Sequence, residues 1–200
     1  GINCSQSILL NDRSEMFDTR KIVSELGLPC FVKPNDGGSS FGISKVKKTI
    51  QLIPAINKAF TEGNGVMIES FLDGKEVTCA CYRAGDKLYD LPLIEIVSEN
   101  EFFDYEAKYE GLSQEICPAR IEDSVRDEVQ ELTRKIYQLL DLKGLIRIDY
   151  ILVNNKPFVI EINTAPGMTA ESLVPKMVKE QENLDLSILF DKLIQEALSI

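Results

Sequence analysis

Histidine is missing from this 200-residue sequence. Without it, the chain cannot build a Ser-His-Asp or Cys-His catalytic group, or a zinc site with imidazole ligands. The sequence also lacks an apolar run near the ~20 residues of a membrane-spanning helix, and it shows no basic-then-apolar signal sequence. A cytoplasmic protein with no membrane partner is therefore expected.

Positive charge is scarce, since 22 Lys and Arg stand against 32 Asp and Glu and the net charge is −10. This balance disfavours binding to nucleic acid or to an anionic membrane, because both need a basic surface. It still allows a small anionic ligand held by a few well-placed Lys and Arg side chains. The five cysteines are odd in number and show no zinc-knuckle or Cys-x-x-Cys spacing, so we expect reduced thiols.

The remaining composition is typical of a globular protein, with 44% hydrophobic residues. The pattern predicts strands and helices in two unequal blocks, mostly with short connections that favour antiparallel pairing. We therefore expect an α+β fold in two lobes, a small one over residues 1–72 and a large one over residues 73–200. A cleft between lobes is the usual place for a ligand.

The most informative stretch, residues 145–163, predicts a β-hairpin with arms rich in Val, Ile, Tyr and Phe. Because side chains alternate across a strand, Arg147 and Asp149 share a face, and so do Glu161 and Asn163. If these faces are the same face of the sheet, Asp149 lies opposite Glu161 and Arg147 opposite Asn163. That register requires a loop with an odd number of residues.

We expect this loop to be the three residues 154–156, with an asparagine in the left-handed conformation. An ordinary sheet with one solvated polar face is one interpretation of the hairpin. Two features favour a binding site instead: the face carries no Lys or Thr, and two opposed carboxylates repel unless a cation lies between them. Asp, Glu and Asn oxygens suit Mg²⁺, and an adjacent Arg suits an anion.

A glycine-rich loop at residues 37–42 lies between a predicted strand at 30–34 and a predicted strand at 43–47. This is not the Walker arrangement, because no helix starts directly after the glycines. Backbone N–H groups in such a loop can still approach phosphate oxygens, since glycine has no Cβ to block them. An ordinary tight hairpin is the alternative, and Lys33 at the entrance of the loop favours phosphate.

Further strands are expected over residues 66–72, 75–82 and 88–97. Residues 98–118 are polar and aromatic without periodicity, which is typical of a functional lid. Apolar spacing predicts helices, one of them capped by Ser124, over residues 11–26, 50–61, 124–140, 171–179 and 186–198.

A series of short motifs follows in order along the chain: Val32-Lys33-Pro34, the loop at 37–42, Ile68-Glu69-Ser70-Phe71-Leu72 with Glu76, Tyr105-Glu106-Ala107-Lys108-Tyr109, Cys117-Pro118-Ala119, Gly144 through Arg147-Ile148-Asp149, and Glu161-Ile162-Asn163-Thr164-Ala165-Pro166-Gly167-Met168-Thr169. In content and order they resemble the D-alanine–D-alanine ligases, which are ATP-grasp enzymes. The resemblance covers essentially the whole chain. It implies the ATP-grasp fold, with two lobes of mainly antiparallel sheet flanked by helices.

The resemblance also implies site residues. ATP would be held by Lys33, Ser40, Glu69, Phe71, Leu72, Glu76, Lys108 and Ile160. Mg²⁺, as two ions that Mn²⁺ can replace, would be held by Asp149, Glu161 and Asn163. The catalytic set would be Ser39, Tyr109, Arg147 and Ser172, and the substrate would contact Arg147, Gly167, Ser172 and Leu173.

The implied reaction joins two D-alanines for peptidoglycan synthesis, through an acyl phosphate made from ATP, in an enzyme that is a homodimer. The family also has an N-terminal domain that this chain lacks, so the chain resembles the ATP-grasp part of a longer protein and is expected to be inactive alone. Phe71 stands where many members carry Trp. Two alternatives remain: a ligase for a different carboxylate and amine, and an inactive fragment that binds Mg²⁺ and ATP.

Overall fold

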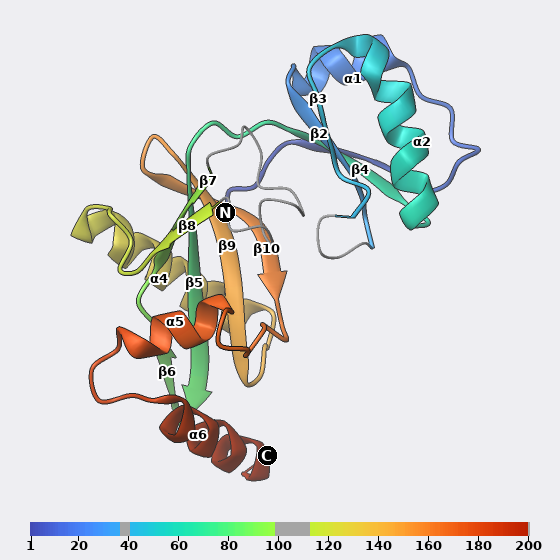
Figure 1. Cartoon of the computed structure of the whole chain (residues 1–200). Coiled ribbons are helices and arrows are strands. Elements are labelled where there is room, and N and C mark those ends of the chain that lie inside the picture. The colour runs from blue at the N-terminus through green and yellow to red at the C-terminus, as the bar shows by residue number, and fades with distance from the viewer. Residues whose placement is uncertain (37–40, 99–112, 200) are drawn as a thin grey trace. The chain divides into compact units, whose positions relative to one another are not determined.

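The computed structural model describes residues 1–36, 41–98 and 113–199, and it divides into two compact units (Figure 1). The larger unit contains Gly1–Cys4, Asp73–Val97 and Gln114–Ile200, and the smaller unit contains Ser5–Leu72. The expected small lobe, residues 1–72, differs at its start. Gly1–Cys4 pack with the larger unit, because the N–H of Val159 donates to the carbonyl of Asn3 at 2.9 Å.

The smaller unit is a four-stranded sheet with helices on one face. The order of its strands is β1 (Ser7–Leu10), β4 (Val66–Ser70), β2 (Cys30–Pro34) and β3 (Ser44–Val46). The helical segments are α1 (Thr19–Leu26), η1 (Thr49–Gln51) and α2 (Leu52–Glu62). Alternation along β2 and β4 sends Cys30, Val32, Val66 and Ile68 into the core with Leu52 and Ile56.

The opposite face of this small sheet is half-buried and chemically mixed. On β2 it carries Phe31 and Lys33, and on β4 it carries Met67 and Glu69. Phe31 lies opposite Glu69 in the register, and Lys33 lies opposite Met67. β2 and β4 each have one apolar face, and their other faces together present a cation, a carboxylate and an aromatic ring.

The larger unit has a sheet of order β10-β9-β5-β7-β8, with β6 paired to β5. Its helix α4 (Asp123–Leu139) covers one face (Figure 1), where Val125, Val129, Ile136 and Tyr137 meet the buried side chains of the sheet. Helices α5 (Leu173–Lys179) and α6 (Leu186–Leu198) follow the sheet in the chain. The strands are β5 (Lys75–Ala84), β6 (Lys87–Asp90), β7 (Ile94–Ser98), β8 (Ser113–Ile116), β9 (Leu145–Val153) and β10 (Lys156–Asn163).

The helix expected over residues 11–26 begins only at Thr19. Asp18 is its N-cap, and the Asp18 carboxylate accepts from the N–H of Arg20 at 2.8 Å. Before this cap Met16 is 96% exposed, so no apolar face exists there to hold a further helical turn. The start of this helix is therefore determined by the capping aspartate and not by the weak apolar spacing before it.

Three other expectations were wrong in detail. The strand expected over residues 88–97 is two strands, since Pro92 interrupts it and has no N–H for a ladder. The long helix begins at Asp123 with Glu122 as its N-cap, so Ser124 is not the cap. Part of the expected lid at 98–118 forms strand β8, and residues 99–112 of it lie outside the described residues. Strand β1 was not expected at all.

Among the described residues, no helix is both long enough and apolar enough to cross a membrane.

Candidate functional site

The hairpin of β9 and β10 has the expected register but not the expected loop. Asp149 lies opposite Glu161, and Arg147 opposite Asn163. The turn, however, is Asn154-Asn155, with φ of 50° and 63°, because Val153 already pairs with Lys156. Two asparagines in the left-handed region form the short turn that matches strand twist, so the three-residue loop was wrong.

A β-bulge at Ile160 reconciles the short turn with the register. Pairing shifts between Val159 and Glu161, which leaves Ile160 without a partner on β9. If pairing continued regularly past Val159, Ile160 would lie opposite Asp149 and Glu161 would turn to the other face of the sheet. The bulge therefore sets the two carboxylates opposite each other, while Ile160 itself is 38% exposed.

Strand β5 completes the polar face from the other side of β9. Thr78 lies opposite Asp149 and Ala80 opposite Arg147. The neighbours of these residues along β9, Ile148 and Tyr150, are fully buried on the α4 side. Three strands therefore place Arg147 and Asp149 in the middle of one half-buried polar surface.

Each of the two carboxylate oxygens of Asp149 accepts two hydrogen bonds. Oδ1 accepts from Arg147 Nε at 2.8 Å and from the Thr78 hydroxyl at 2.6 Å. Oδ2 accepts from Arg147 Nη2 at 2.9 Å and from Asn163 Nδ2 at 3.1 Å. The arginine contact is bidentate, which fixes the guanidinium plane as well as its position.

The charges around Arg147 keep it protonated. Burial acts to lower its pKa, but the hydrogen bonds and charge of Asp149, with the charges of Glu161 and Glu76, outweigh burial and raise the pKa. Three carboxylates thus surround one guanidinium, and the face is acidic overall. Such a face suits added positive charge, and the fixed guanidinium suits an anion that approaches it.

Asp149, Glu161 and Asn163 fit Mg²⁺ by residue type and by register. Carboxylate and amide oxygens are its usual protein ligands, and these three side chains lie on two paired strands. Among the described residues, no group of three His, Cys, Asp or Glu side chains could hold a metal ion. The third ligand would therefore be the Asn163 amide, whose nitrogen now faces Asp149 and whose oxygen must turn to bind a cation.

On the smaller unit, Lys33 and Glu69 form an ion pair across β2 and β4. Lys33 Nζ lies 2.5 Å from Glu69 Oε2, and both side chains are about one-fifth exposed, at 22% and 18%. The buried Ser5 hydroxyl donates to Glu69 Oε1 at 3.0 Å. Each oxygen of this carboxylate therefore has a partner, and the lysine is held at the end of β2 that leads into the glycine-rich loop.

Phe71 lies in an aromatic and cationic group on the same unit. Its ring centroid is 6.0 Å from that of Phe31, and Lys45 Nζ lies 4.3 Å from the Phe71 centroid. A cation at this distance from a ring face is attracted by the ring quadrupole. Phe71, which follows β4, therefore packs against Phe31, and Phe31 lies opposite Glu69 in the register.

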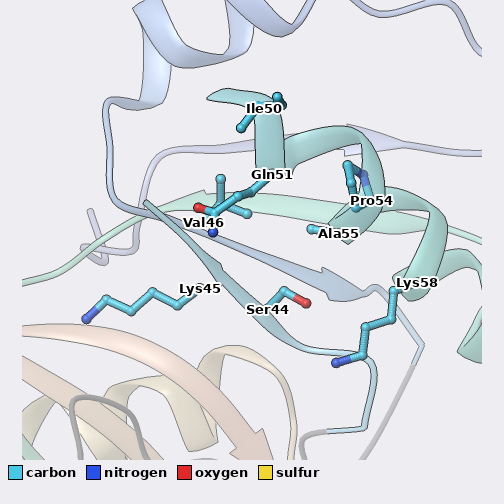
Figure 2. A pocket seen from close by; sticks show the side chains of 8 residues that line it. All are labelled: Ser44, Lys45, Val46, Ile50, Gln51, Pro54, Ala55 and Lys58. Atoms are coloured by element: carbon cyan, nitrogen blue, oxygen red, sulfur yellow. The ribbon is translucent and has the colours of Figure 1, made fainter. Parts of the chain in front are cut away.

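An open pocket of about 350 Å³ lies beside β3, and Figure 2 shows Lys45 and Lys58 on either side of Ser44. Lys58 Nζ donates to the carbonyl of Ile43 at 3.3 Å. None of the residues expected in a site lines this pocket, so we assign it no function. Its lining is Ser44, Lys45, Val46, Ile50, Gln51, Pro54, Ala55 and Lys58.

The segment expected to contact the substrate precedes α5. A Cβ on Gly167 would lie 2.7 Å from Ser172 Oγ, so a larger residue there would displace the serine hydroxyl. The Ser172 hydroxyl lies 2.9 Å from that of Thr169 and accepts from the Thr169 N–H at 3.2 Å. Gly167, Ser172 and its neighbour Leu173 are thus brought together in one compact turn.

The structure brings the expected residues together in separate groups. Arg147, Asp149, Glu161 and Asn163 share one face, Lys33 pairs with Glu69, and Glu76 lies close enough to act on Arg147. Leu72 is the residue at which the chain leaves the smaller unit, since Asp73 belongs to the larger one. Four expected residues lie outside the described part of the chain: Ser39, Ser40, Lys108 and Tyr109.

Sequence reasoning missed two residues that bind carboxylates of the expected site, Ser5 and Thr78. Both are buried and both donate a hydroxyl to an expected site carboxylate. Alternation along the strand at 75–84 could place Thr78 on the same face as Glu76. Its partner Asp149 is 71 residues away in the chain, and no local pattern reveals such a pairing.

The family model described as "D-ala D-ala ligase C-terminus" matches residues 1–195. A D-alanine–D-alanine ligase of Phocaeicola vulgatus is 48% identical over 196 residues, which are 98% of this chain and 60% of that protein. The chain therefore spans about three-fifths of the length of such a curated relative.

Solved structures agree. The VanG D-Ala:D-Ser ligase of Enterococcus faecalis superposes with a TM-score of 0.84 at 34% identity, over 97% of this chain and 57% of that one. A D-alanine–D-alanine ligase of Bacillus anthracis complexed with ATP gives a TM-score of 0.81 at 28% identity, over 99% of this chain and 61% of that one. These likenesses extend over both units of the chain.

Proposed function

This chain belongs to the D-alanine–D-alanine ligase family, with an α+β ATP-grasp fold, and we propose that the longer protein it represents joins two D-alanines at the expense of ATP. The observation that carries the proposal is the Arg147–Asp149 pair, set opposite Glu161 and Asn163 by the bulge at Ile160. An acidic face around one fixed guanidinium is what a transferring phosphoryl group and its Mg²⁺ require.

The proposed reaction has two steps. The carboxylate of the first D-alanine takes the γ-phosphoryl group of ATP, giving an acyl phosphate and ADP. The amine of the second D-alanine then attacks the acyl carbon, and the dipeptide and phosphate leave. No side-chain nucleophile is needed, so a chain without histidine can perform this chemistry.

Arg147 would stabilise charge in both steps. Asp149 binds Nε and Nη2, so the Nη1 donors of the guanidinium remain for the phosphoryl oxygens and for the tetrahedral intermediate. Asp149, Glu161 and Asn163 would hold Mg²⁺, or Mn²⁺ in its place. When bound, the metal ion would supply positive charge to the phosphates.

The other assignments follow the family resemblance. We propose that Lys33 holds phosphate and that Ser172, with Gly167 and Leu173, receives the carboxylate of the second D-alanine. We also propose that Ser39 and Tyr109 belong to the catalytic set. The remaining residues would complete the ATP site: Ser40, Glu69, Phe71, Leu72, Glu76, Lys108 and Ile160.

The same resemblance supports a cytoplasmic homodimer that makes a peptidoglycan precursor. Its partners would be ATP and D-alanine, without nucleic acid or membrane.

A second amine substrate is also worth testing. The D-Ala:D-Ser ligase of Enterococcus faecalis superposes on this chain with a TM-score of 0.84, and its name gives D-serine as a substrate. The 48% identity to a D-alanine–D-alanine ligase favours D-alanine over D-serine.

The test is phosphate release by a protein extended to the full length of its relatives. We expect turnover with ATP and D-alanine, much less with D-serine, and none with L-alanine. The 200-residue chain alone should turn over little, because orienting two reactants supplies about 7–11 kcal/mol and the relatives are longer than this chain. Turnover of the extended protein with other amino acids but not with D-alanine would overturn the assignment.

A further inference from the structure

Thr78 is a buried polar residue that the proposed function does not use. Its exposed fraction is 0%, and it lies opposite Asp149 in the register of β5 and β9. A buried hydroxyl needs a hydrogen-bond partner, and such partners determine which way the groups around it face.

The hydroxyl has two acceptors within reach but only one proton. Thr78 Oγ1 lies 2.6 Å from Asp149 Oδ1 and 3.2 Å from the carbonyl of Ile148. An O–H···O⁻ bond to a carboxylate is about 2.5–2.7 Å long and stronger than a neutral one. The proton therefore goes to Asp149, and this donor is fixed to a strand whose own position is set by a fully paired ladder.

The three other hydrogen bonds to Asp149 come from side chains that the proposed function assigns to a ligand. Arg147 supplies two of them and Asn163 the third, and the proposed function assigns Arg147 to substrate and Asn163 to the metal. Thr78 is buried, and the proposed function assigns it to neither the substrate nor the metal. Its hydroxyl can therefore hold the carboxylate while the other donors change partner.

We propose that Thr78 is a positioning residue, whose hydroxyl orients the Asp149 carboxylate for the divalent cation. This inference rests on the proposed function, which makes Asp149 a metal ligand. A partner of a metal ligand commonly changes metal affinity about 10- to 100-fold.

The experiment measures Mn²⁺ binding to the full-length protein by electron paramagnetic resonance of the free ion, with ADP present. Thr78→Val removes the hydroxyl and keeps the shape, so affinity should fall about 10-fold or more. Thr78→Ser keeps the hydroxyl and should restore affinity to within about 3-fold of the wild type. If Thr78→Val does not fold, Thr78→Ala replaces it in the same assay.

Thr133 provides the matched control. It is a second fully buried threonine of the larger unit, whose hydroxyl meets Tyr150 and the carbonyl of Val129, both at 2.8 Å. Thr133→Val should lower thermal stability and leave Mn²⁺ affinity unchanged. If Thr78→Val does the same, Thr78 is merely structural and the inference is wrong.

Asp149→Asn separates this inference from the proposed function. Weak Mn²⁺ binding by Asp149→Asn together with wild-type binding by Thr78→Val overturns the role of Thr78 alone. Wild-type binding by Asp149→Asn overturns the metal assignment, and the role of Thr78 with it.

Discussion

The polar faces of the two sheets differ in chemistry although both arise from strand alternation. On the larger unit, the carboxylates of Asp149, Glu161 and Glu76 surround the single guanidinium of Arg147. On the smaller unit, one lysine pairs with one carboxylate beside two phenylalanine rings. The first face is acidic and tightly hydrogen-bonded, and the second has two lysines, Lys33 and Lys45, to one glutamate and is partly apolar.

This difference indicates a division of labour. An acidic face with a fixed guanidinium suits a divalent cation and a reacting phosphoryl group. A lysine beside aromatic rings suits a flat base and the phosphates attached to it. Substitutions on the larger unit should therefore act on turnover and on metal dependence. Those on the smaller unit should act on nucleotide affinity whatever the metal concentration.

The largest effect is expected for Arg147→Ala in the extended protein. Turnover should fall about 100- to 1,000-fold, as when one donor to a developing charge is removed. ATP affinity should fall less, because the charge is needed mainly as the phosphoryl group transfers. Steady-state phosphate release gives kcat and KM, and Arg126→Ala on the exposed face of α4 is the control. Equal losses in kcat and in ATP affinity would contradict this role.

Glu161→Gln should have the next largest effect. This change removes the charge of one of the two opposed carboxylates and leaves the register and the bulge at Ile160 unchanged. Mg²⁺-dependent ATP affinity should fall about 100-fold, which calorimetry at two Mg²⁺ concentrations can measure. Ile160→Ala keeps both carboxylates and should retain the metal dependence. Retained dependence in Glu161→Gln would contradict the assignment of Glu161 to the metal.

Lys33→Met should weaken ATP binding about 10-fold through loss of one charge-assisted contact. The loss should be the same at low and high Mg²⁺, unlike the loss caused by Glu161→Gln. Lys58→Met is a matched control on the same unit, since Lys58 donates to the carbonyl of Ile43 and lies outside the proposed site. A loss that depends on Mg²⁺ would remove the proposed division between the two faces.

The smallest effect is expected for Glu95→Gln, a change in stability alone. Glu95 is buried between Arg120 and Lys75, and the Arg120 hydrogen bonds hold its pKa well below the ordinary 4.5, at about 2. A lowered pKa stabilises the fold above pH 4.5, and this contribution is lost as the pH falls from 4.5 towards about 2.

The partly exposed cations reduce the contribution of Glu95 from the full value of the shift to about 1–2 kcal/mol. Thermal unfolding at pH 7 and at pH 3 should show a smaller pH dependence in Glu95→Gln than in the wild type. Glu128→Gln breaks an exposed pair with Lys156 and should change little. A wild-type pH profile in Glu95→Gln would contradict the assignment.

Much of the fold could be predicted from local pattern. The strand over 30–34 and the helix over 186–198 have the expected bounds, because alternation and helical spacing are strong there. The spacing of Arg147, Asp149, Glu161 and Asn163 also predicted their register, since period two puts each pair on one face. The same order of motifs carried the family resemblance, which the comparisons confirmed.

The remainder depended on contacts between distant residues. Asp149 finds Thr78 only when β5 pairs with β9, and Glu69 finds Ser5 only when the chain before β1 lies beside β4. The bulge at Ile160 and the split of residues 88–97 also left no periodic signal. Side-chain alternation and helical spacing are properties of neighbours in the chain, so the sequence alone predicted faces and motifs. Pairing between strands that are distant in the sequence depends on the tertiary structure. This pairing alone determined which buried hydroxyls hold the site carboxylates.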